Sequence, residues 1–217
     1  MFSNDTRTKL ESIVGGKVIK TAEDSCTATR NLLCASFRTS TTVKKDFEGQ
    51  SVIKEEQAGL LRSYCRQKGL WVQELPGEHQ FLARGGEAKV YMDRDNRTVI
   101  KLNDAVYYAT WLEFFNSLVI HNTLFKETAY TFVGFTEKDN SLQAILRQPF
   151  ITSDAPVELA EINALLVFND FENTRRNDYY NKELGLILGD MHDENDISSG
   201  GDLYFIDTVF YTVSANP

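Results

Sequence analysis

Hydrophobic positions divide the chain into a helical N-terminal part and a strand-rich remainder. In the first part, apolar residues recur at spacings of three and four, which predicts helices over residues 9–14, 23–37 and 54–67. Gly15 and Gly69 follow two of these helices, at positions where a helix C-terminus favours glycine. Residues 38–49 are rich in Ser, Thr and Lys, and we predict an exposed loop or linker there.

From residue 70 onward, short apolar runs separated by turn residues predict strands. The predicted strands cover residues 70–72, 81–84, 89–92, 98–102, 129–135 and 142–146. Turns rich in glycine, aspartate and asparagine connect them, which favours an antiparallel sheet. Residues 148–151 are expected to leave the sheet, because the proline at 149 cannot continue a central strand.

Two helices are predicted within this strand-rich part. Residues 105–121 carry aromatic side chains around most of the helix circumference, so we expect this helix to be buried, with Asp104 capping its start. A second helix over residues 156–168 is expected to turn four side chains inward, namely Leu159, Ile162, Leu165 and Leu166. The polar and aromatic stretch 173–182 is predicted to be a loop.

Near the C-terminus, two apolar runs at residues 184–188 and 203–206 flank Ser-Ser-Gly-Gly-Asp at 198–202, which predicts a tight hairpin connection. Such a hairpin would bring Asn195 and Asp207 to the same end of two neighbouring strands, with Asp190 just before the turn. Carboxylate and amide oxygens gathered in this way suit Mg²⁺, which takes its other ligands from phosphate and water. The alternative is an acidic surface turn, because the same residue types are common in loops.

Composition narrows the range of partners. The net charge is -8 and the pI is about 5.0, which argues against sequence-independent nucleic-acid binding. The three cysteines, Cys26, Cys34 and Cys65, have no metal-ligand spacing, and they favour a reduced, cytoplasmic setting. No apolar run reaches membrane-spanning length, and the N-terminus lacks the pattern of a signal peptide, so no membrane partner is expected.

Three residues before the hairpin have the chemistry for binding phosphate, and a single acid follows them on the next helix. Gly85 and Gly86 form a turn whose backbone N–H groups can approach phosphate oxygens closely. Lys101 lies in a Val-Ile-Lys-Leu strand, on the face opposite its apolar neighbours. Glu113 is the only acid of the next helix. The alternatives are an ordinary hairpin turn, a solvated strand lysine and a helix stripe that faces water.

The order of these features resembles the kinase-like domain found in polyvalent proteins of phages and conjugative elements, within the protein kinase and aminoglycoside kinase superfamily. The resemblance extends from about residue 50 to the C-terminus. It is carried by residues 85–91, 99–103, 121–122, 148–151, 190–195 and 205–207. It implies a Ser/Thr/Tyr kinase that uses ATP and Mg²⁺, with a host protein or a protein encoded by the mobile element as a possible phosphate acceptor.

The resemblance assigns a role to each matching residue before the hairpin. The Gly85-Gly86 turn and Val90 would cover the nucleotide. Lys101 would contact its phosphates while Glu113 holds the lysine in place.

The remaining roles belong to the second part of the chain. Gln148 and Phe150 stand where the backbone of a kinase usually bonds the adenine. Asp190 would receive the proton of the substrate hydroxyl, and Asn195 and Asp207 would hold the metal. Two departures from the pattern are visible, because glycine replaces arginine before the Asp at 190 and Thr-Val replaces Phe-Gly after the Asp at 207.

The expected fold is therefore α+β, a reduced protein-kinase-like two-lobe fold. Residues 1–69 would form an N-terminal helical appendage. Residues 70–148 would form a small lobe with an antiparallel sheet and one buried helix, and ATP would lie between it and a truncated large lobe at residues 149–217 that carries the catalytic loop.

Only ten residues follow Asp207, so we expect no recognisable platform for a peptide substrate. Two alternatives therefore stay open. One is a catalytically inactive, pseudokinase-like module that binds nucleotide or protein. The other is a metal-dependent hydrolase built on Asp190, His192, Asp193 and Asp207.

Overall fold

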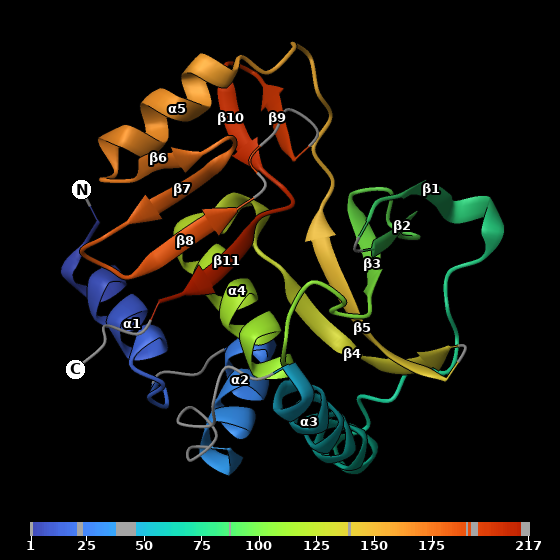
Figure 1. Ribbon diagram of the computed structural model, residues 1–217. Coiled ribbons are helices and arrows are strands. Elements are labelled where there is room, and N and C mark those ends of the chain that lie inside the picture. The colour runs from blue at the N-terminus through green and yellow to red at the C-terminus, as the bar shows by residue number, and fades with distance from the viewer. Residues whose placement is uncertain are drawn as a thin grey trace. The chain divides into compact units, whose positions relative to one another are not determined.

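The computed structural model describes residues 2–20, 24–37, 47–86, 88–138, 140–189, 191 and 195–213. Contacts divide the chain into two compact units (Figure 1). The first, which we call the five-strand unit, contains Ala22–Phe115 and Tyr130–Phe150. The second, the four-strand unit, contains Met1–Thr21, Asn116–Ala129 and Ile151–Pro217. The three-part division predicted from the sequence stays a prediction.

An antiparallel sheet forms the centre of the five-strand unit. Its strand order is β1-β2-β3-β5-β4, with β1 at Phe81–Arg84, β2 at Ala88–Met92, β3 at Thr98–Asn103, β4 at Thr131–Lys138 and β5 at Ser141–Pro149. These strands confirm the predicted ones between residues 81 and 146. The expected exit from the sheet at 148–151 was placed too early, because β5 continues through Gln148 and Pro149. Pro149 is tolerated there because it is the last residue of its strand and pairs with Thr98, the first residue of β3.

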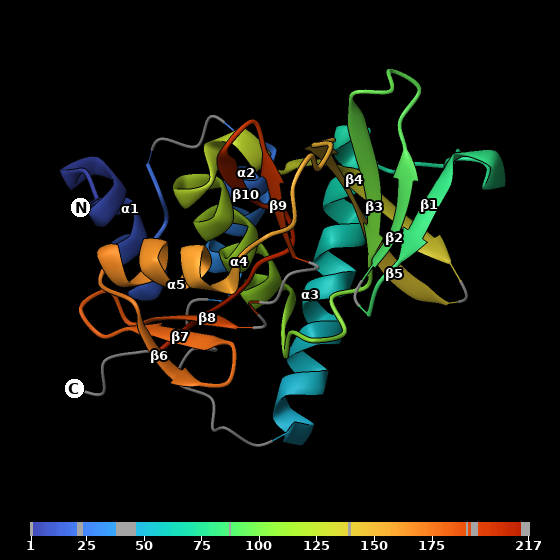
Figure 2. The same cartoon turned by 90° about the horizontal axis from the view of Figure 1, so that it is seen from above.

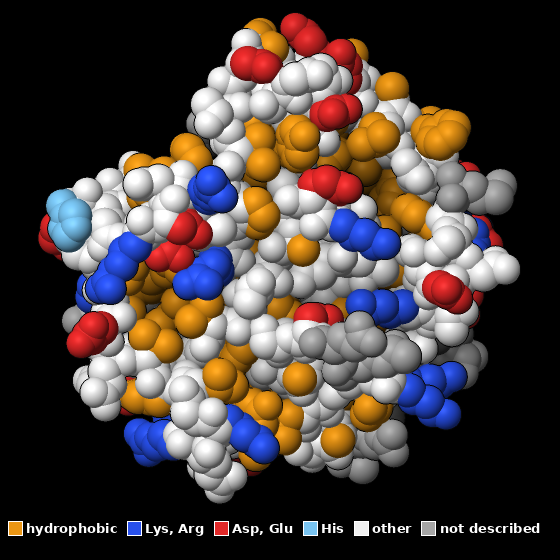
Figure 3. Space-filling view, turned by 180° about the vertical axis from the view of Figure 1, so that it is seen from behind, with side chains coloured by type: hydrophobic (Ala, Val, Ile, Leu, Met, Phe, Trp, Pro, Cys, Tyr) orange, Lys and Arg blue, Asp and Glu red, His pale blue; other side chains and the backbone are white. Residues whose placement is uncertain are grey.

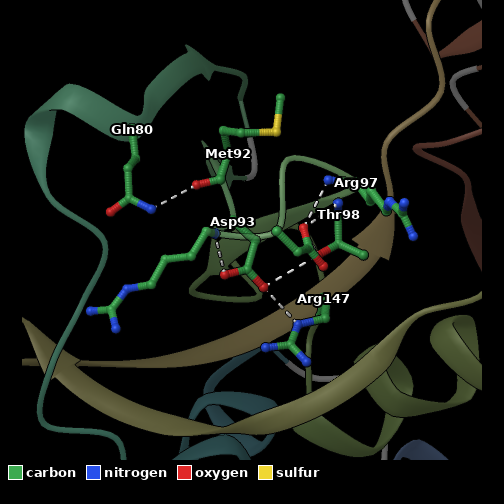
Figure 4. A network of polar contacts seen from close by, with 8 residues as sticks. Gln80, Met92, Asp93, Arg97, Thr98 and Arg147 are labelled. Carbon is green, nitrogen blue, oxygen red and sulfur yellow. Dashed lines mark hydrogen bonds and ion pairs between the residues drawn. The ribbon is translucent and has the colours of Figure 1, made fainter.

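A network of polar side chains fixes the predicted turn between β2 and β3 (Figure 4). The Asp95 carboxylate accepts the backbone N–H groups of Arg97 and Thr98 at 2.8 and 2.9 Å. Asp93 accepts the Thr98 hydroxyl at 3.2 Å and forms an ion pair of 2.9 Å with Arg147 on β5. The turn is thereby tied to two strands of the sheet.

One face of the sheet is covered by the segment that follows the third helix. Tyr91, Ile100, Leu102 and Ile145 form a buried cluster on which Val72, Leu75 and Val133 pack. The predicted strand at 70–72 is reduced to a single parallel bridge between Trp71 and Phe135. Here the Phe135 N–H donates to the Leu70 carbonyl at 3.0 Å, and the Val72 N–H donates to the Phe135 carbonyl at 2.8 Å.

Aromatic rings join the sheet to the first turn of α4, which spans Trp111–Leu124. Trp111 meets Phe135 edge to face at a ring-centroid distance of 5.1 Å, and Phe115 meets Phe132 at 5.2 Å. Edge-to-face pairs at such distances stabilise a core beyond their area burial. The burial expected for this helix is confirmed, since Phe114 and Phe115 are 2% and 0% exposed.

The predicted start of this helix at residue 105 was wrong. Ala105 has a left-handed backbone with φ of 56°, and its N–H donates to the Asn103 side chain at 2.7 Å. Asp104 accepts the N–H of Val106 at 3.0 Å, so it stabilises a turn instead of capping a helix. These local hydrogen bonds hold the backbone out of helical geometry until Thr110.

Two further helices belong to the five-strand unit, α2 at Ser25–Ser36 and α3 at Phe47–Lys68, and both contact β4 (Figure 2). Asp24 caps α2 by accepting the Thr27 N–H at 2.8 Å. Gly69 ends α3 with φ of 69°, which confirms the predicted stop. Because α3 begins at Phe47, the last residues of the predicted linker are helical, and its residues 38–46 lie outside the described part of the chain.

The four-strand unit contains a sheet of order β11-β8-β7-β6 and a separate two-stranded hairpin. The sheet strands are β6 at Glu172–Arg175, β7 at Asp178–Asn181, β8 at Leu186–Gly189 and β11 at Val209–Thr212, and the hairpin strands are β9 at Asp196–Ser199 and β10 at Asp202–Phe205. The loop predicted at 173–182 is therefore wrong. Tyr179 and Asn181 are buried while Asp178 and Tyr180 are only partly buried, which is strand alternation, and Arg176 supplies the turn with φ of 52°.

Two complete helices of the four-strand unit precede these strands in the sequence. Helix α1, Asn4–Val14, confirms the predicted helix and starts earlier, with Ser3 accepting the Thr6 N–H as its cap. Helix α5, Leu159–Phe168, buries only Ile162 and Leu166. The inward orientation predicted for Leu159 and Leu165 is wrong, since they are 55% and 40% exposed. No helix among the described residues is long and apolar enough to cross a membrane.

Candidate functional site

Lys101 is a buried cation at the middle of the five-strand sheet. It is 5% exposed, which rules out the alternative of a solvated strand lysine. Its cross-strand neighbours are Val90 on β2 and Leu146 on β5, so the predicted nucleotide-binding residues Val90 and Lys101 share one face of the sheet. Its ammonium lies 5.5 Å from the centre of the Tyr130 ring. A buried ammonium persists only where it has favourable interactions of this kind.

The predicted glycine turn connects β1 and β2. The Gly85 N–H donates to the Ala88 carbonyl at 2.9 Å and closes the turn. Gly86 lies against Tyr107, whose hydroxyl would be 2.6 Å from a Cβ at this position. The residue at 87 lies outside the described part of the chain. A role of this turn in covering phosphates stays a prediction.

Glu113 helps to cap the N-terminus of its own helix, α4. The Thr110 hydroxyl accepts the Glu113 N–H at 3.1 Å, while the Glu113 carboxylate accepts the Ala109 N–H at 3.0 Å. This reciprocal pattern is close to a capping box, in which a Thr and a Glu three residues apart satisfy free N–H groups of a helix start. Glu113 therefore has a structural role, and its predicted pairing with Lys101 stays a prediction.

Lys54 on α3 is the cation whose charge acts on Glu113. Burial raises the pKa of the Glu113 carboxyl, and hydrogen bonds from the backbone of Ala109 and Thr110, together with the charge of Lys54, oppose that rise. The Lys54 ammonium donates to the carbonyls of Ala105 and Tyr108 at 2.6 and 2.9 Å. Lys54 thus ties α3 to the non-helical segment that precedes α4.

Substitution of Glu113 by glutamine is expected to change how stability depends on pH. A folded-state pKa above the unfolded value favours the protonated carboxyl in the folded protein. The resulting stabilisation is fully present below the unfolded pKa and is lost as pH rises through the folded pKa. Glu113→Gln keeps an oxygen that accepts the Ala109 N–H, and it cannot ionise. As pH rises from the unfolded to the folded pKa of Glu113, the variant should therefore lose less stability than the parent.

Urea unfolding at a series of pH values from about 4 to 7 measures this difference. Glu161→Gln is the control, because it removes the same charge from an exposed position in the first turn of α5. Equal pH profiles for Glu113→Gln and the parent would show that the folded-state pKa of Glu113 is not raised.

Gln148 and Phe150 flank the end of β5 and differ in exposure. Gln148 is 1% exposed and pairs with Val99 in the sheet, whereas Phe150 is 41% exposed. The Phe150 N–H donates to the Arg97 carbonyl at 2.8 Å. This N–H is therefore already used within the protein, and adenine recognition by residues 148–150 stays a prediction.

The β9–β10 hairpin brings together the two predicted metal ligands of the four-strand unit. Asp196 pairs with Phe205, and beyond this pair the Ile206 N–H donates to the Asn195 carbonyl at 2.9 Å. Gly200 and Gly201, with φ of 63° and 85°, form the turn at the other end. The predicted hairpin connection is confirmed, and Asn195 and Asp207 stand at its open end. The first strand of the hairpin is nevertheless 196–199, because residues 186–189 pair with β7 and β11 instead.

Asp190, His192 and Asp193 lie outside the described residues, so the roles predicted for them stay predictions. They include the proton acceptor of the kinase hypothesis, Asp190, and three of the four metal ligands of the hydrolase alternative. Within the described ranges, no three or more His, Cys, Asp or Glu side chains are grouped so that they could hold a metal ion. The candidate metal ligands Asn195 and Asp207 form a smaller set that relies on oxygens from elsewhere.

Sequence reasoning missed the part that His121 plays in positioning Asp207. His121 is fully buried on α4, with Nδ1 2.7 Å from the Thr208 hydroxyl and Nε2 3.0 Å from the Thr128 carbonyl. The Thr128 hydroxyl in turn donates to the Phe205 carbonyl at 2.6 Å. These contacts hold the chain on both sides of Asp207. The sequence offered a lone histidine on an apolar helix and the family resemblance at residues 121–122, but neither identified the partners of His121, which are distant in sequence.

Ring stacking and a further hydrogen bond also hold the segment around Asp207. The Phe125 ring stacks on Phe205 with a centroid distance of 4.4 Å, and the Phe210 N–H donates to the Ser117 hydroxyl at 2.9 Å. The second half of α4 therefore anchors β10, β11 and the residues between them. Asp207 lies on a backbone that is held at several points on either side.

Antiparallel sheets and five α-helices in the described part of the chain define an α+β protein that is compatible with a kinase-like fold. The model of a sequence family described as "Serine/Threonine/Tyrosine Kinase found in polyvalent proteins" matches residues 54–214. This match covers most of the chain, and the protein therefore belongs to that family. Comparison with curated proteins and with solved structures finds no match to either.

Proposed function

We propose that the protein is an ATP- and Mg²⁺-dependent phosphotransferase that transfers the γ-phosphoryl group to a hydroxyl acceptor. Membership of a kinase family supports this proposal. The observation that carries it is the β9–β10 hairpin, since the hydrogen bond from the Ile206 N–H to the Asn195 carbonyl brings Asn195 and the segment bearing Asp207 to one end of two strands.

The chemistry of this end of the hairpin fits Mg²⁺. Asn195 offers an amide oxygen and Asp207 a carboxylate, and Mg²⁺ is usually held by one or two carboxylates together with phosphate oxygens. Asn195 and Asp207 would hold the ion. When bound, the ion would neutralise charge on the phosphates of the nucleotide.

Lys101 would contribute a fixed positive charge toward the phosphates. Its burial supports this role, because a cation removed from water interacts more strongly with an anion than a solvated one does. The strand on either side of Lys101 is held in the sheet by β2 and β5, so the charge is preorganised.

Asp190 would complete the reaction as the proton acceptor. The acceptor hydroxyl oxygen forms a bond to the γ-phosphorus, the bond from that phosphorus to the β,γ-bridging oxygen breaks, and ADP leaves. The hydroxyl proton passes to the Asp190 carboxylate. A protein acceptor encoded by a host or by a mobile element is part of the same proposal.

Thermal unfolding with and without ATP and Mg²⁺ tests the nucleotide site. A ligand that binds only the folded state stabilises it by about 2.7 kcal/mol at a concentration 100 times its Kd. We expect a Mg²⁺-dependent rise in the melting midpoint that Asp207→Asn removes. Asp202→Asn is the control, because it removes the same charge from the exposed turn end of the same hairpin.

Two results would contradict the proposal. No rise in the midpoint at millimolar ATP would leave a protein-binding module as the better hypothesis. A rise that survives in Asp207→Asn would place the metal elsewhere. Incubation with γ-labelled ATP then separates a kinase from a pseudokinase-like module, because only the kinase transfers label to an acceptor or to itself.

A further inference from the structure

Helix α5 is apolar on nearly all sides, yet only one side is packed. Among its ten residues Glu161 is the only charged one. Ile162 and Leu166 are 1% and 3% exposed, whereas Val167 and Phe168 are 55% and 75% exposed. A helix that is hydrophobic all round is normally buried all round. The outward side of α5 therefore has the composition of a surface that another molecule covers.

Helical geometry separates the two sides clearly. At 100° per residue, Ile162 and Leu166 point in one direction, and Ala164, Val167 and Phe168 lie on the opposite half of the helix. Single exposed apolar residues are ordinary, but a contiguous exposed apolar face marks an interaction site. Because Phe168 is the largest of these residues, it is the natural centre of the exposed face.

An apolar cavity of about 200 Å³ adjoins this helix within the four-strand unit. Leu165 and Leu166 of α5 belong to its wall, and the rest is formed by Phe2, Leu124, Phe125, Asn169, Phe171, Leu188, Leu203, Phe205 and Phe210. Figure 3 shows hydrophobic side chains around a hollow in the molecular surface. A dry cavity of about 150 Å³ is large enough for benzene, so this one has room for an aromatic side chain.

The exposed face is flanked by acidic residues at both ends of the helix. Glu158 and Glu161 are exposed at its start, and Asp170 and Glu172 are exposed just after its end. The exposed cations that follow are Arg175, the last residue of β6, and Arg176, in the turn between β6 and β7. The whole chain carries a net charge of -8. Lysine and arginine at the edge of a partner would complement this rim.

We infer that the exposed face of α5 and the adjoining cavity form a docking site for an amphipathic helix of a protein partner. The partner helix would lay its apolar side on Phe168 and Leu165, place an aromatic anchor in the cavity that Leu165 lines and carry basic residues along its edges. Helix-in-groove recognition works through such an apolar stripe and a buried anchor. A second copy of this chain fits less well, because it would bring a like-charged acidic rim to the same face.

Two synthetic peptides test this inference with the full chain. Each is an amphipathic helix of about 18 residues, or five turns, with leucines and one tryptophan on the apolar side. One peptide has lysine at the edges and the other has glutamate. Fluorescence anisotropy should show that the lysine peptide binds at least about tenfold more tightly, with an affinity that falls as salt is added.

Substitutions in α5 locate the site. Phe168→Asp and Leu165→Asp should each weaken binding of the lysine peptide at least about tenfold, since both place a charge on an apolar contact surface. Val52→Asp is the matched control, because Val52 is also an exposed apolar residue on a helix, at 59% exposure, and should leave the affinity unchanged. Equal melting midpoints establish that Phe168→Asp folds.

Four outcomes would overturn the inference. The first is equal binding of both peptides, and the second is equal weakening by Val52→Asp and Phe168→Asp. The third is concentration-dependent dimerisation that Phe168→Asp abolishes, which would make the occupant a second copy. The fourth is binding of phosphatidylserine vesicles, without peptide binding, that Phe168→Asp abolishes. None of these measurements involves nucleotide, so the docking site and the proposed kinase activity stand or fall separately.

Discussion

Alanine in place of Gly134 is expected to lower the free energy of unfolding by about 3 kcal/mol or more. An alanine Cβ at this position would lie 2.0 Å from the Leu70 carbonyl oxygen and 2.9 Å from its carbon. Both are backbone atoms, so no side-chain rotation relieves the overlap. The Leu70 carbonyl also accepts the Phe135 N–H. The added Cβ would therefore break the bridge between residues 70–72 and β4.

Urea unfolding of Gly134→Ala measures this effect. Gly59→Ala is the control, because Gly59 lies in α3 and a Cβ added there would have no atom within 4 Å. Alanine is favoured over glycine inside a helix, so this control should gain about 0.5–1 kcal/mol. A Gly134→Ala protein as stable as the parent would mean that the chain before β1 does not approach β4 as closely as described.

Methionine in place of Lys101 is expected to lower the rate of phosphoryl transfer by roughly 10²- to 10³-fold, as the loss of one preorganised charge does in other active sites. The same substitution is expected to leave the protein folded, because a methionine side chain is close in volume to the lysine stem and keeps the packing between β2 and β5. A loss of activity without a loss of stability would separate a role in the reaction from a role in the core.

Lys89→Met is the control for this prediction. Lys89 lies on the neighbouring strand and pairs with Leu102, so it faces the other side of the sheet. The Lys89→Met variant should therefore retain the activity of the parent. If Lys101→Met unfolds the protein while Lys89→Met does not, the interactions of the Lys101 ammonium are structural, and the assignment to phosphate contact would be wrong.

Local pattern in the sequence was enough to predict the five-strand sheet. The strands between residues 81 and 146 are separated by turns with their own chemistry, such as the Asp95 carboxylate that accepts two backbone N–H groups. The errors occurred where local hydrogen bonds or pairing partners decide the structure. Ala105 is held in a left-handed turn inside an apparently helical stretch, and β8 pairs with β7 and β11.

The candidate site was predictable in part for the same reason. The Gly-Gly turn and the apolar run at 203–206 were enough to predict the hairpin connection that brings Asn195 to Asp207, although the first strand of the hairpin is Asp196–Ser199 and not the apolar run at 184–188. The burial of Lys101 and the contacts of His121 could not, because they depend on Tyr130 and Thr208, which are far away in the sequence. The capping role of Glu113 was hidden by the misplaced start of its helix.

The path of the chain between the two units limits how the protein can be divided. The four-strand unit is assembled from three separate stretches, and one continuous helix, α4, passes from the five-strand unit into it between Phe115 and Asn116. No single cut therefore releases either unit whole. A fragment cut at any single point would lack part of one of the two cores, so fragments of the chain are not expected to fold on their own.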